Sequence, residues 1–247
     1  LSSCREMSHS LILETSPYSY WYQEMSQNEL TYLKYQKESL PDDDYVFQQA
    51  EMYFQTHEYN KAIQYYQIYI KVNEIKGPDT NLATCYNNIG LVYESQGEYK
   101  KALDFHLKAL KLFKSTPDKE NRPSVAASLN GIGSVYENQG KFNKALEYYT
   151  RSLEIFKSAF GENHPEVASC YNDLGVVFES LGDYARALQF YSKSLDIEEA
   201  VYGKEHPHVT GCYMNIGLIY VRMGKCKRAL DFYFQSLDVC KSVHGEK

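Results

Sequence analysis

The stretch NHPEVASCYNDLGVVFESLGDYARALQFYSKSLDI, Asn163 to Ile197, decides the fold because its pattern recurs along most of the chain. Two glycines seven residues apart recur every 42 or 43 residues, and an alanine follows the first glycine after twelve residues. The four copies are Gly90/Gly97/Ala102, Gly133/Gly140/Ala145, Gly175/Gly182/Ala187 and Gly217/Gly224/Ala229. A weaker upstream copy has Ala50 and Ala62 at the first-glycine and alanine positions, so the sequence contains five repeats.

The apolar spacing inside one repeat is that of helices. Tyr171, Leu174 and Phe178 are three and four residues apart, the interval at which side chains share one helical face. Gly182 followed by Asp183 is a turn signal, with the glycine where a helix C-terminus favours one. Each repeat is therefore predicted to be an antiparallel helix pair. Such units cannot bury their apolar faces alone, so we expect an all-α superhelix, a solenoid of about five stacked pairs.

Two columns of small residues are predicted to be buried. A missing side chain at the first glycine would let the partner helix approach, and a leucine there would overpack the contact by roughly 1–3 kcal/mol. The second column lies five residues before this glycine and contains Cys85, Ser128, Cys170 and Cys212. These cysteines are expected to be reduced and mostly structural, which favours a cytoplasmic location.

The chain is predicted to divide near residue 44. Residues 1–43 do not fit the repeat and are expected to be an N-terminal capping segment or a degenerate repeat; the alternative is the tail of a preceding domain. Residues 44–247 are expected to hold the five repeats, at about 44–77, 78–120, 121–162, 163–204 and 205–247. Residues 244–247 match residues 160–163, after which another helix begins, so the chain is expected to be a fragment of a longer array.

Composition limits the classes of function. The 247 residues carry a formal net charge of -6, and no basic cluster offers an electrostatic footprint for nucleic acid. No run of 18 apolar residues occurs, so no membrane span is expected. We therefore expect neither a nucleic-acid partner nor a membrane partner.

The repeat pattern resembles a known family. The order Tyr-Asn-Asp-Leu-Gly-x-x-Phe-x-x-x-Gly-x-Tyr-x-x-Ala-Leu-x-x-Tyr, from Tyr171 to Tyr191, resembles the tetratricopeptide repeat. The His-Pro openings at 164–165 and 206–207 and the 42-residue period are similar to its kinesin light chain type. The resemblance covers residues 44–247. HEAT and armadillo repeats have a similar period but not this glycine, tyrosine and alanine pattern, so we rank them lower.

The resemblance implies a concave groove lined by the first helix of each repeat. The positions that would face it lie three residues before, one after and four after the first glycine, and together they form one stripe on a helix. We call this the inner stripe. Its predicted peptide-binding residues, together with the neighbouring Arg222, are Asn87, Leu91, Glu94, Asn130, Ser134, Glu137, Asn172, Val176, Glu179, Met214, Leu218 and Arg222.

The asparagines of the inner stripe suit recognition of a peptide backbone. A carboxamide presents a donor and an acceptor together, so it can bind a peptide N–H or C=O whatever the peptide sequence. The resemblance implies that Asn87, Asn130 and Asn172 hold an extended partner segment in this way. The alternative is that each asparagine only bonds to a neighbouring helix.

The charge of the inner stripe predicts which segments would bind. Chaperone-binding relatives use lysine and arginine to hold a terminal carboxylate, and here only Arg222 lies near the right face. Glu94, Glu137 and Glu179 would repel an acidic ligand. We therefore predict a neutral or basic extended segment as the partner, with a solvated acidic face as the alternative.

No catalytic motif or cofactor site is expected. His206, His208 and Cys212 could suggest a metal site, but His206 fits the His-Pro opening and Cys212 its column. His106 occupies a position that is tyrosine in the other repeats, and it is predicted to be a packing residue. The predicted function is a non-catalytic, adaptor-like scaffold for protein or peptide binding. The alternative is an accessory region of a larger enzyme or motor, and self-association through exposed array ends is a third role.

Overall fold

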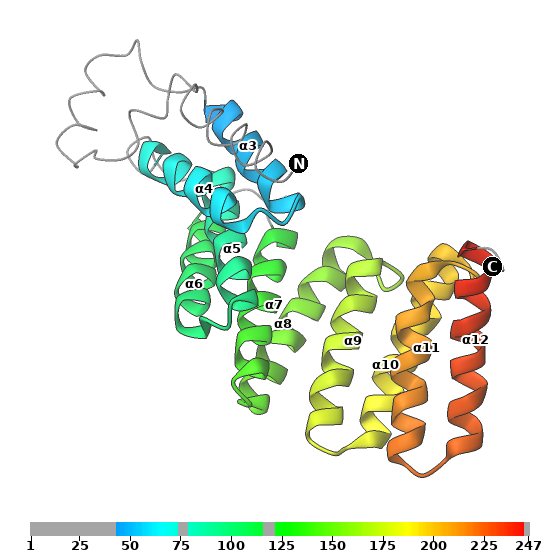
Figure 1. Cartoon of the computed structure of the whole chain (residues 1–247). Helices are drawn as coiled ribbons and strands as arrows, with labels where there is room; N and C mark the ends of the chain where they lie inside the picture. Colours follow the sequence, from blue (N-terminus) through cyan, green and yellow to red (C-terminus); the bar gives the residue numbers. More distant parts are fainter. Residues whose placement is uncertain (1–42, 74–78, 116–121, 245–247) are drawn as a thin grey trace, which may run out of the picture. The chain divides into compact units, whose positions relative to one another are not determined.

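The computed structural model describes residues 43–73, 79–115 and 122–244, and these residues form α-helices and short connections without a strand (Figure 1). The proposed N-terminal cap lies outside the described residues, apart from Asp43, and so does the match at 245–247. In chain order the helices are α3 (Asp43–Gln55), α4 (Tyr59–Asn73), α5 (Thr80–Ser95), α6 (Tyr99–Ser115), α7 (Arg122–Asn138), α8 (Phe142–Phe160), α9 (Pro165–Ser180), α10 (Tyr184–Tyr202), α11 (Pro207–Arg222) and α12 (Cys226–His244).

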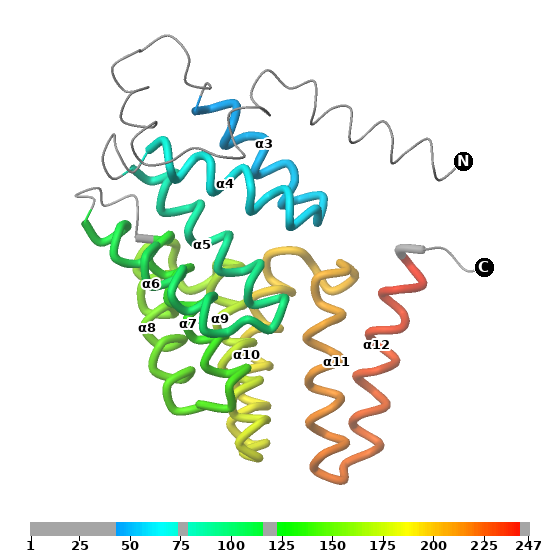
Figure 2. Tube along the Cα trace, turned by 60° about the vertical axis from the view of Figure 1, so that its left-hand side comes forward, coloured from blue at the N-terminus to red at the C-terminus, as the bar shows by residue number. Residues whose placement is uncertain are grey.

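Consecutive helices form the predicted pairs. The odd-numbered helices are the first helices of their repeats and the even-numbered helices the second; Figure 2 shows α11 and α12 running antiparallel. The described chain divides into two compact units, one up to Cys85 and one from Tyr86 onward. Within the second unit, successive pairs stack through α6 on α7, α8 on α9 and α10 on α11. This confirms the all-α solenoid of about five helix pairs.

The turn inside each pair follows one hydrogen-bonding scheme. After α9, the Gly182 N–H donates to the Glu179 carbonyl at 2.9 Å and the Asp183 N–H to the Phe178 carbonyl at 2.9 Å. Gly182 has a φ of +76°, the left-handed conformation that closes a Schellman motif. The same two bonds close the other four pairs. In the first pair His57 takes the glycine position with a φ of 60°.

The first glycines mark the closest approach within a pair. A Cβ built on Gly175 would lie 2.6 Å from Tyr191 Cε1, and one built on Gly133 would lie 2.7 Å from Tyr149 Cδ1. Real side chains do not tolerate such distances, so the tyrosine ring occupies the space that the glycine leaves. The predicted packing role of this column is confirmed.

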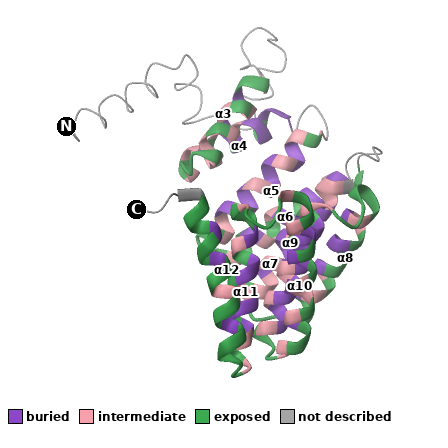
Figure 3. Ribbon diagram, turned by 90° about the vertical axis from the view of Figure 1, so that its right-hand side faces the viewer, coloured by how far each residue is buried: buried purple, intermediate pink, exposed green. Residues whose placement is uncertain are grey.

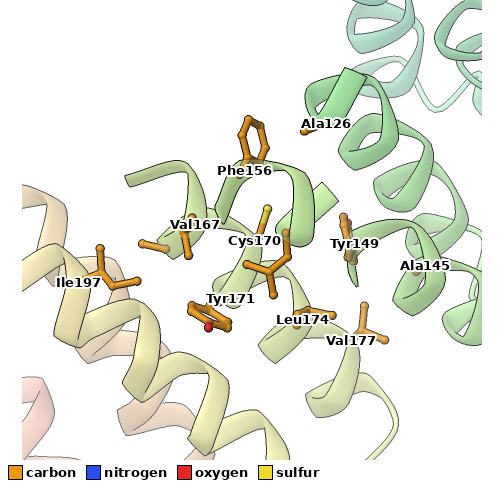
Figure 4. Close-up of a cluster of buried hydrophobic side chains, with 12 residues drawn as sticks. Ala126, Ala145, Tyr149, Phe156, Val167, Cys170, Tyr171, Leu174, Val177 and Ile197 are labelled. Carbon is orange, nitrogen blue, oxygen red and sulfur yellow. The ribbon is translucent and has the colours of Figure 1, made fainter. Parts of the chain in front are cut away.

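The core lies between the helices of the second unit. Figure 4 shows one cluster, in which Cys170, Leu174 and Val177 of α9 meet side chains of α7, α8 and α10. The small-residue column is buried, as predicted: Ser128 is fully buried, and the Cys170 thiol contacts the Ser152 hydroxyl at 3.7 Å. Figure 3 shows buried positions along the packed helix faces and exposed positions on α12. No helix in the described ranges is both long enough and apolar enough to cross a bilayer.

Candidate functional site

A polar groove lies on the first helices of the second unit. It has a volume of about 660 Å³ and is bordered mainly by α5 and α7. Five residues of the predicted inner stripe line it: Asn87, Leu91, Glu94, Asn130 and Ser134. The remaining lining residues are Ser95, Tyr99, Ala127, Gly131, Asn138, Phe156 and Glu166.

The asparagines of the inner stripe bond across repeats. Asn130 Nδ2 donates to Asp173 Oδ2 at 3.0 Å, which joins α7 to α9. Asn215 Nδ2 donates to Asn172 Oδ1 at 2.8 Å, which joins α9 to α11. Asp173 and Asn215 lie two residues before the first glycine of their repeats, a column that the sequence reading did not use. Asn130 and Asn172 therefore do bond to a neighbouring helix, which was the alternative role considered from the sequence. Each uses one end of its carboxamide for this bond.

Repeat two replaces this link with a histidine. His106 lies in the tyrosine column, is completely buried, and its Nδ1 lies 2.9 Å from Asn87 Oδ1. Its ring fills the space beside two glycines, because a Cβ on Gly90 would lie 2.8 Å and one on Gly131 2.6 Å from its Cε1. Gly131 takes the position that Asp173 holds in the next repeat. The paired departures, His106 and Gly131, were the sequence signal for this change.

The glutamates of the inner stripe are hydrogen-bonded to the second helices. The Tyr149 hydroxyl donates to Glu137 Oε2 at 2.8 Å, and the Tyr191 hydroxyl donates to Glu179 Oε2 at 3.1 Å. In both of these repeats the tyrosine lies twelve residues after the glutamate, so the pairing was readable from the repeat spacing.

Glu94 differs from the other glutamates because His106 replaces its tyrosine. Glu94 Oε1 accepts hydrogen bonds from the Ser134 hydroxyl and from Asn138 Nδ2, the latter at 3.0 Å. Its other oxygen, Oε2, lies 3.9 Å from His106 Nε2. Glu94 thus joins α5 to α7 at the groove while one carboxylate oxygen remains without a hydrogen bond among the described residues.

The carboxylates around the groove make it strongly acidic. Burial raises the pKa of Asp173 to about 6; the bond from Asn130 opposes this shift, whereas the negative charges of Glu137, Glu166 and Glu94 add to it. Burial likewise raises the pKa of Glu137, and the charge of Glu94 adds to the increase. A site with these properties favours cations over anions.

The inner stripe becomes apolar toward the C-terminus. Met214 is 56% exposed, and Leu218 and Val221 are also exposed on α11. Arg222 is exposed in the last turn of the same helix. Val176 on α9 is half-buried and packs against a core cluster of α9–α12, so it offers less surface than expected of a groove residue.

The histidines considered as metal ligands have other partners. The His206 ring accepts a hydrogen bond from the His208 N–H at 3.3 Å, as an N-cap before Pro207. His208 Nδ1 lies 3.8 Å from Glu198 Oε2, and the Cys212 thiol contacts the Ser194 hydroxyl at 3.6 Å. Within the described residues, no group of three or more His, Cys, Asp or Glu side chains could hold a metal ion.

Comparisons with known proteins agree with this architecture. The family model of the tetratricopeptide repeat matches residues 45–115, 124–200 and 180–242, whereas a comparison with curated proteins found no match. BtubC (BKLC) from P. vanneervenii has a TM-score of 0.70 at 24% identity, over 89% of this chain and 89% of that chain. A kinesin light chain-like protein from Podosopora anserina with nearly identical repeats has a TM-score of 0.66 at 15% identity, over 84% of this chain and 100% of that chain.

A third similar protein was solved with a peptide bound. The Rap conjugation gene regulator of plasmid pLS20, in complex with the Phr* peptide, has a TM-score of 0.65 at 17% identity, over 81% of this chain and 54% of that chain. At these identities the three structures show a shared fold. The family match extends over most of the sequence, and the helix pairs repeat one turn geometry and one packing scheme. The chain belongs to the tetratricopeptide repeat family.

Proposed function

We propose that this chain is a non-catalytic scaffold that binds an extended segment of a partner protein along the inner stripe of α5, α7 and α9. The tetratricopeptide repeat is in general a scaffold fold without catalytic activity of its own. Stacked repeats of this kind present extended surfaces suited to long ligands. The Rap regulator, which shares the fold, was solved with a peptide bound, and we extend that mode of binding to this chain.

The asparagine side chains carry the proposal. Each uses one end within the protein: Asn87 its oxygen, Asn130 its nitrogen and Asn172 its oxygen. The ends that remain are a donor, an acceptor and a donor in successive repeats. An extended peptide backbone presents the complementary carbonyl, amide and carbonyl groups. The asparagines can therefore join the repeats and hold a ligand at the same time.

Asn130 Oδ1 adds an energetic argument. This oxygen is buried and has no hydrogen-bond donor within the described residues. A buried acceptor without a donor costs about 1–3 kcal/mol. Asn130 lines the groove, so a ligand N–H that bonded to this oxygen would recover part of that energy.

A peptide selection followed by substitution tests the proposal. Random twelve-residue peptides are selected for binding to the whole chain, and the Kd of an enriched peptide is measured by fluorescence anisotropy. The triple variant Asn87→Ala, Asn130→Ala, Asn172→Ala is expected to weaken binding at least about tenfold, because three backbone contacts of about 1 kcal/mol each are lost.

A matched variant controls for general effects. Asn143→Ala, Gln189→Ala and Gln235→Ala remove three exposed amides from second helices and are expected to leave the Kd within about twofold. Circular dichroism at the temperature of the titration checks that both variants are folded. Unchanged binding by the folded inner-stripe variant, or no enriched peptide at all, would contradict the proposal.

A further inference from the structure

The acidic groups of the groove have no lysine or arginine partner among the described residues. In the second unit, the ion pairs that described lysines and arginines make all use carboxylates of second helices or turns, such as Glu98, Asp104 and Glu147. None of them reaches Glu94, Glu137 or Asp173. Lysines and arginines thus pair with acids elsewhere, and the acids of the inner stripe have no such partner.

Glu94 is the carboxylate best placed for a ligand. It lines the groove, and its side chain is only 13% exposed, so its charge is weakly screened by water. Its Oε1 accepts from two neutral donors, Ser134 and Asn138. Its Oε2 has no donor within hydrogen-bond distance among the described residues.

Two buried polar atoms at or near the groove have no hydrogen-bond partner among the described residues. The first is His106 Nε2, which belongs to a completely buried side chain and lies 3.9 Å from Glu94 Oε2. The second is Asn130 Oδ1, an acceptor without a donor. A carboxylate oxygen and an amide oxygen that both lack donors call for a ligand that brings several donors and a positive charge.

We propose that the groove between α5 and α7 receives a lysine or arginine side chain of the bound segment, with Glu94 as its counter-ion and Asn130 Oδ1 as a further acceptor. The inference rests on the proposed function and specifies the kind of side chain that one subsite of the groove binds. An ammonium group supplies three N–H donors and a guanidinium five, whereas an acidic or aliphatic side chain supplies none. The positive charge also offsets the repulsion among Glu94, Glu166 and Asp173, which raises the pKa of Asp173.

The selected peptides test this subsite separately from the groove as a whole. Enriched sequences are expected to share a lysine or arginine at one aligned position. Replacing that residue with norleucine, which keeps the chain length and removes the charge, is expected to weaken binding to the wild-type chain about tenfold, as loss of one charge-assisted contact does.

Substitutions in the protein complete a double-mutant cycle with the basic and norleucine peptides. Glu94→Gln keeps an acceptor for Ser134 and Asn138, and it is expected to weaken binding of the basic peptide about tenfold while leaving the norleucine peptide unchanged. Glu98→Gln removes the same charge outside the groove and is expected to change neither Kd by more than about twofold. The norleucine measurement on the wild-type chain decides the question even if Glu94→Gln does not fold.

The outcomes distinguish the two proposals. Enriched peptides without a shared basic position, or a basic peptide that binds Glu94→Gln as tightly as the wild type, would overturn the cationic subsite and leave the proposed function in place. A selection that enriches no peptide would overturn both.

Discussion

At the scale of single residues, Asp173 combines a structural bond with an unfavourable charge. It accepts a hydrogen bond from Asn130, yet burial and three neighbouring carboxylates raise its pKa to about 6. An aspartate in an unfolded chain has a pKa of about 3.9. The folded protein therefore binds the proton more tightly, and this group makes the free energy of unfolding fall as the pH rises from about 4 to about 6. Above that window its full cost is present.

Replacing Asp173 should remove this cost. Asp173→Asn keeps an oxygen that accepts from Asn130, and it is expected to raise the free energy of unfolding at pH 7 by about 1–3 kcal/mol. The dependence on pH between 4 and 6 should become flatter than in the wild type. Urea unfolding followed by circular dichroism at pH 4, 5, 6 and 7 measures both effects.

Asp104→Asn is the matched control at this scale. It removes an exposed carboxylate of α6 that pairs with Lys108, and it is expected to change the free energy of unfolding by less than about 0.5 kcal/mol at pH 7. A loss of stability in Asp173→Asn at pH 7 would show that Asp173 contributes more through its hydrogen bond than its charge costs.

At the scale of elements, the turn within each pair depends on one left-handed residue. Gly140 has a φ of +70°, and nothing lies within 4 Å of a Cβ built on it, so a substitution there changes the backbone preference alone. Gly140→Ala is expected to lower the free energy of unfolding by about 1–2 kcal/mol. His57, with a φ of 60° in the equivalent turn, already bears that cost.

Substitution of the left-handed residue in the first turn is therefore expected to change the free energy of unfolding in the opposite direction. His57→Gly is expected to raise the free energy of unfolding by about 0.5–1 kcal/mol, reduced by loss of the contact between His57 Nδ1 and the Tyr59 hydroxyl at 2.9 Å. Thermal or urea unfolding of Gly140→Ala and His57→Gly measures the two changes. Equal signs for the two substitutions would contradict the assignment of a common turn geometry.

The elements were predictable from sequence because each is specified locally. The glycine of the turn, the helical spacing of Tyr171, Leu174 and Phe178, and the glycine that faces Tyr191 all act within one repeat. Each of these features recurs in several repeats, so its structural interpretation does not depend on a single copy.

The contacts of the candidate site were less predictable because they depend on neighbouring repeats. The bond from Asn130 to Asp173 joins residues 43 apart, and its existence depends on how α7 lies against α9. In repeat two, His106 and Gly131 replace that link. Predicting this change requires recognising that both residues depart from the repeat pattern. Sequence placed Asn87, Asn130 and Glu94 at the groove but could not say which of their atoms the fold already uses.

At the scale of the whole molecule, the described parts of the chain keep their charges apart. Lysines and arginines of the second unit pair with acids on second helices and turns, whereas Glu94, Glu137 and Asp173 gather on the first helices. Toward α11 the stripe becomes apolar, with Met214 and Leu218 exposed. We expect a partner segment to carry basic residues opposite α5–α9 and apolar residues opposite α11.

A crystal structure of the chain with a selected peptide bound tests the central claim most directly. The account predicts an extended peptide along α5, α7 and α9, with its backbone groups within hydrogen-bond distance of Asn87, Asn130 and Asn172 and a basic side chain at Glu94. A peptide seated on the second helices, or one that crosses the first helices without a bond to any of these asparagines, would contradict it.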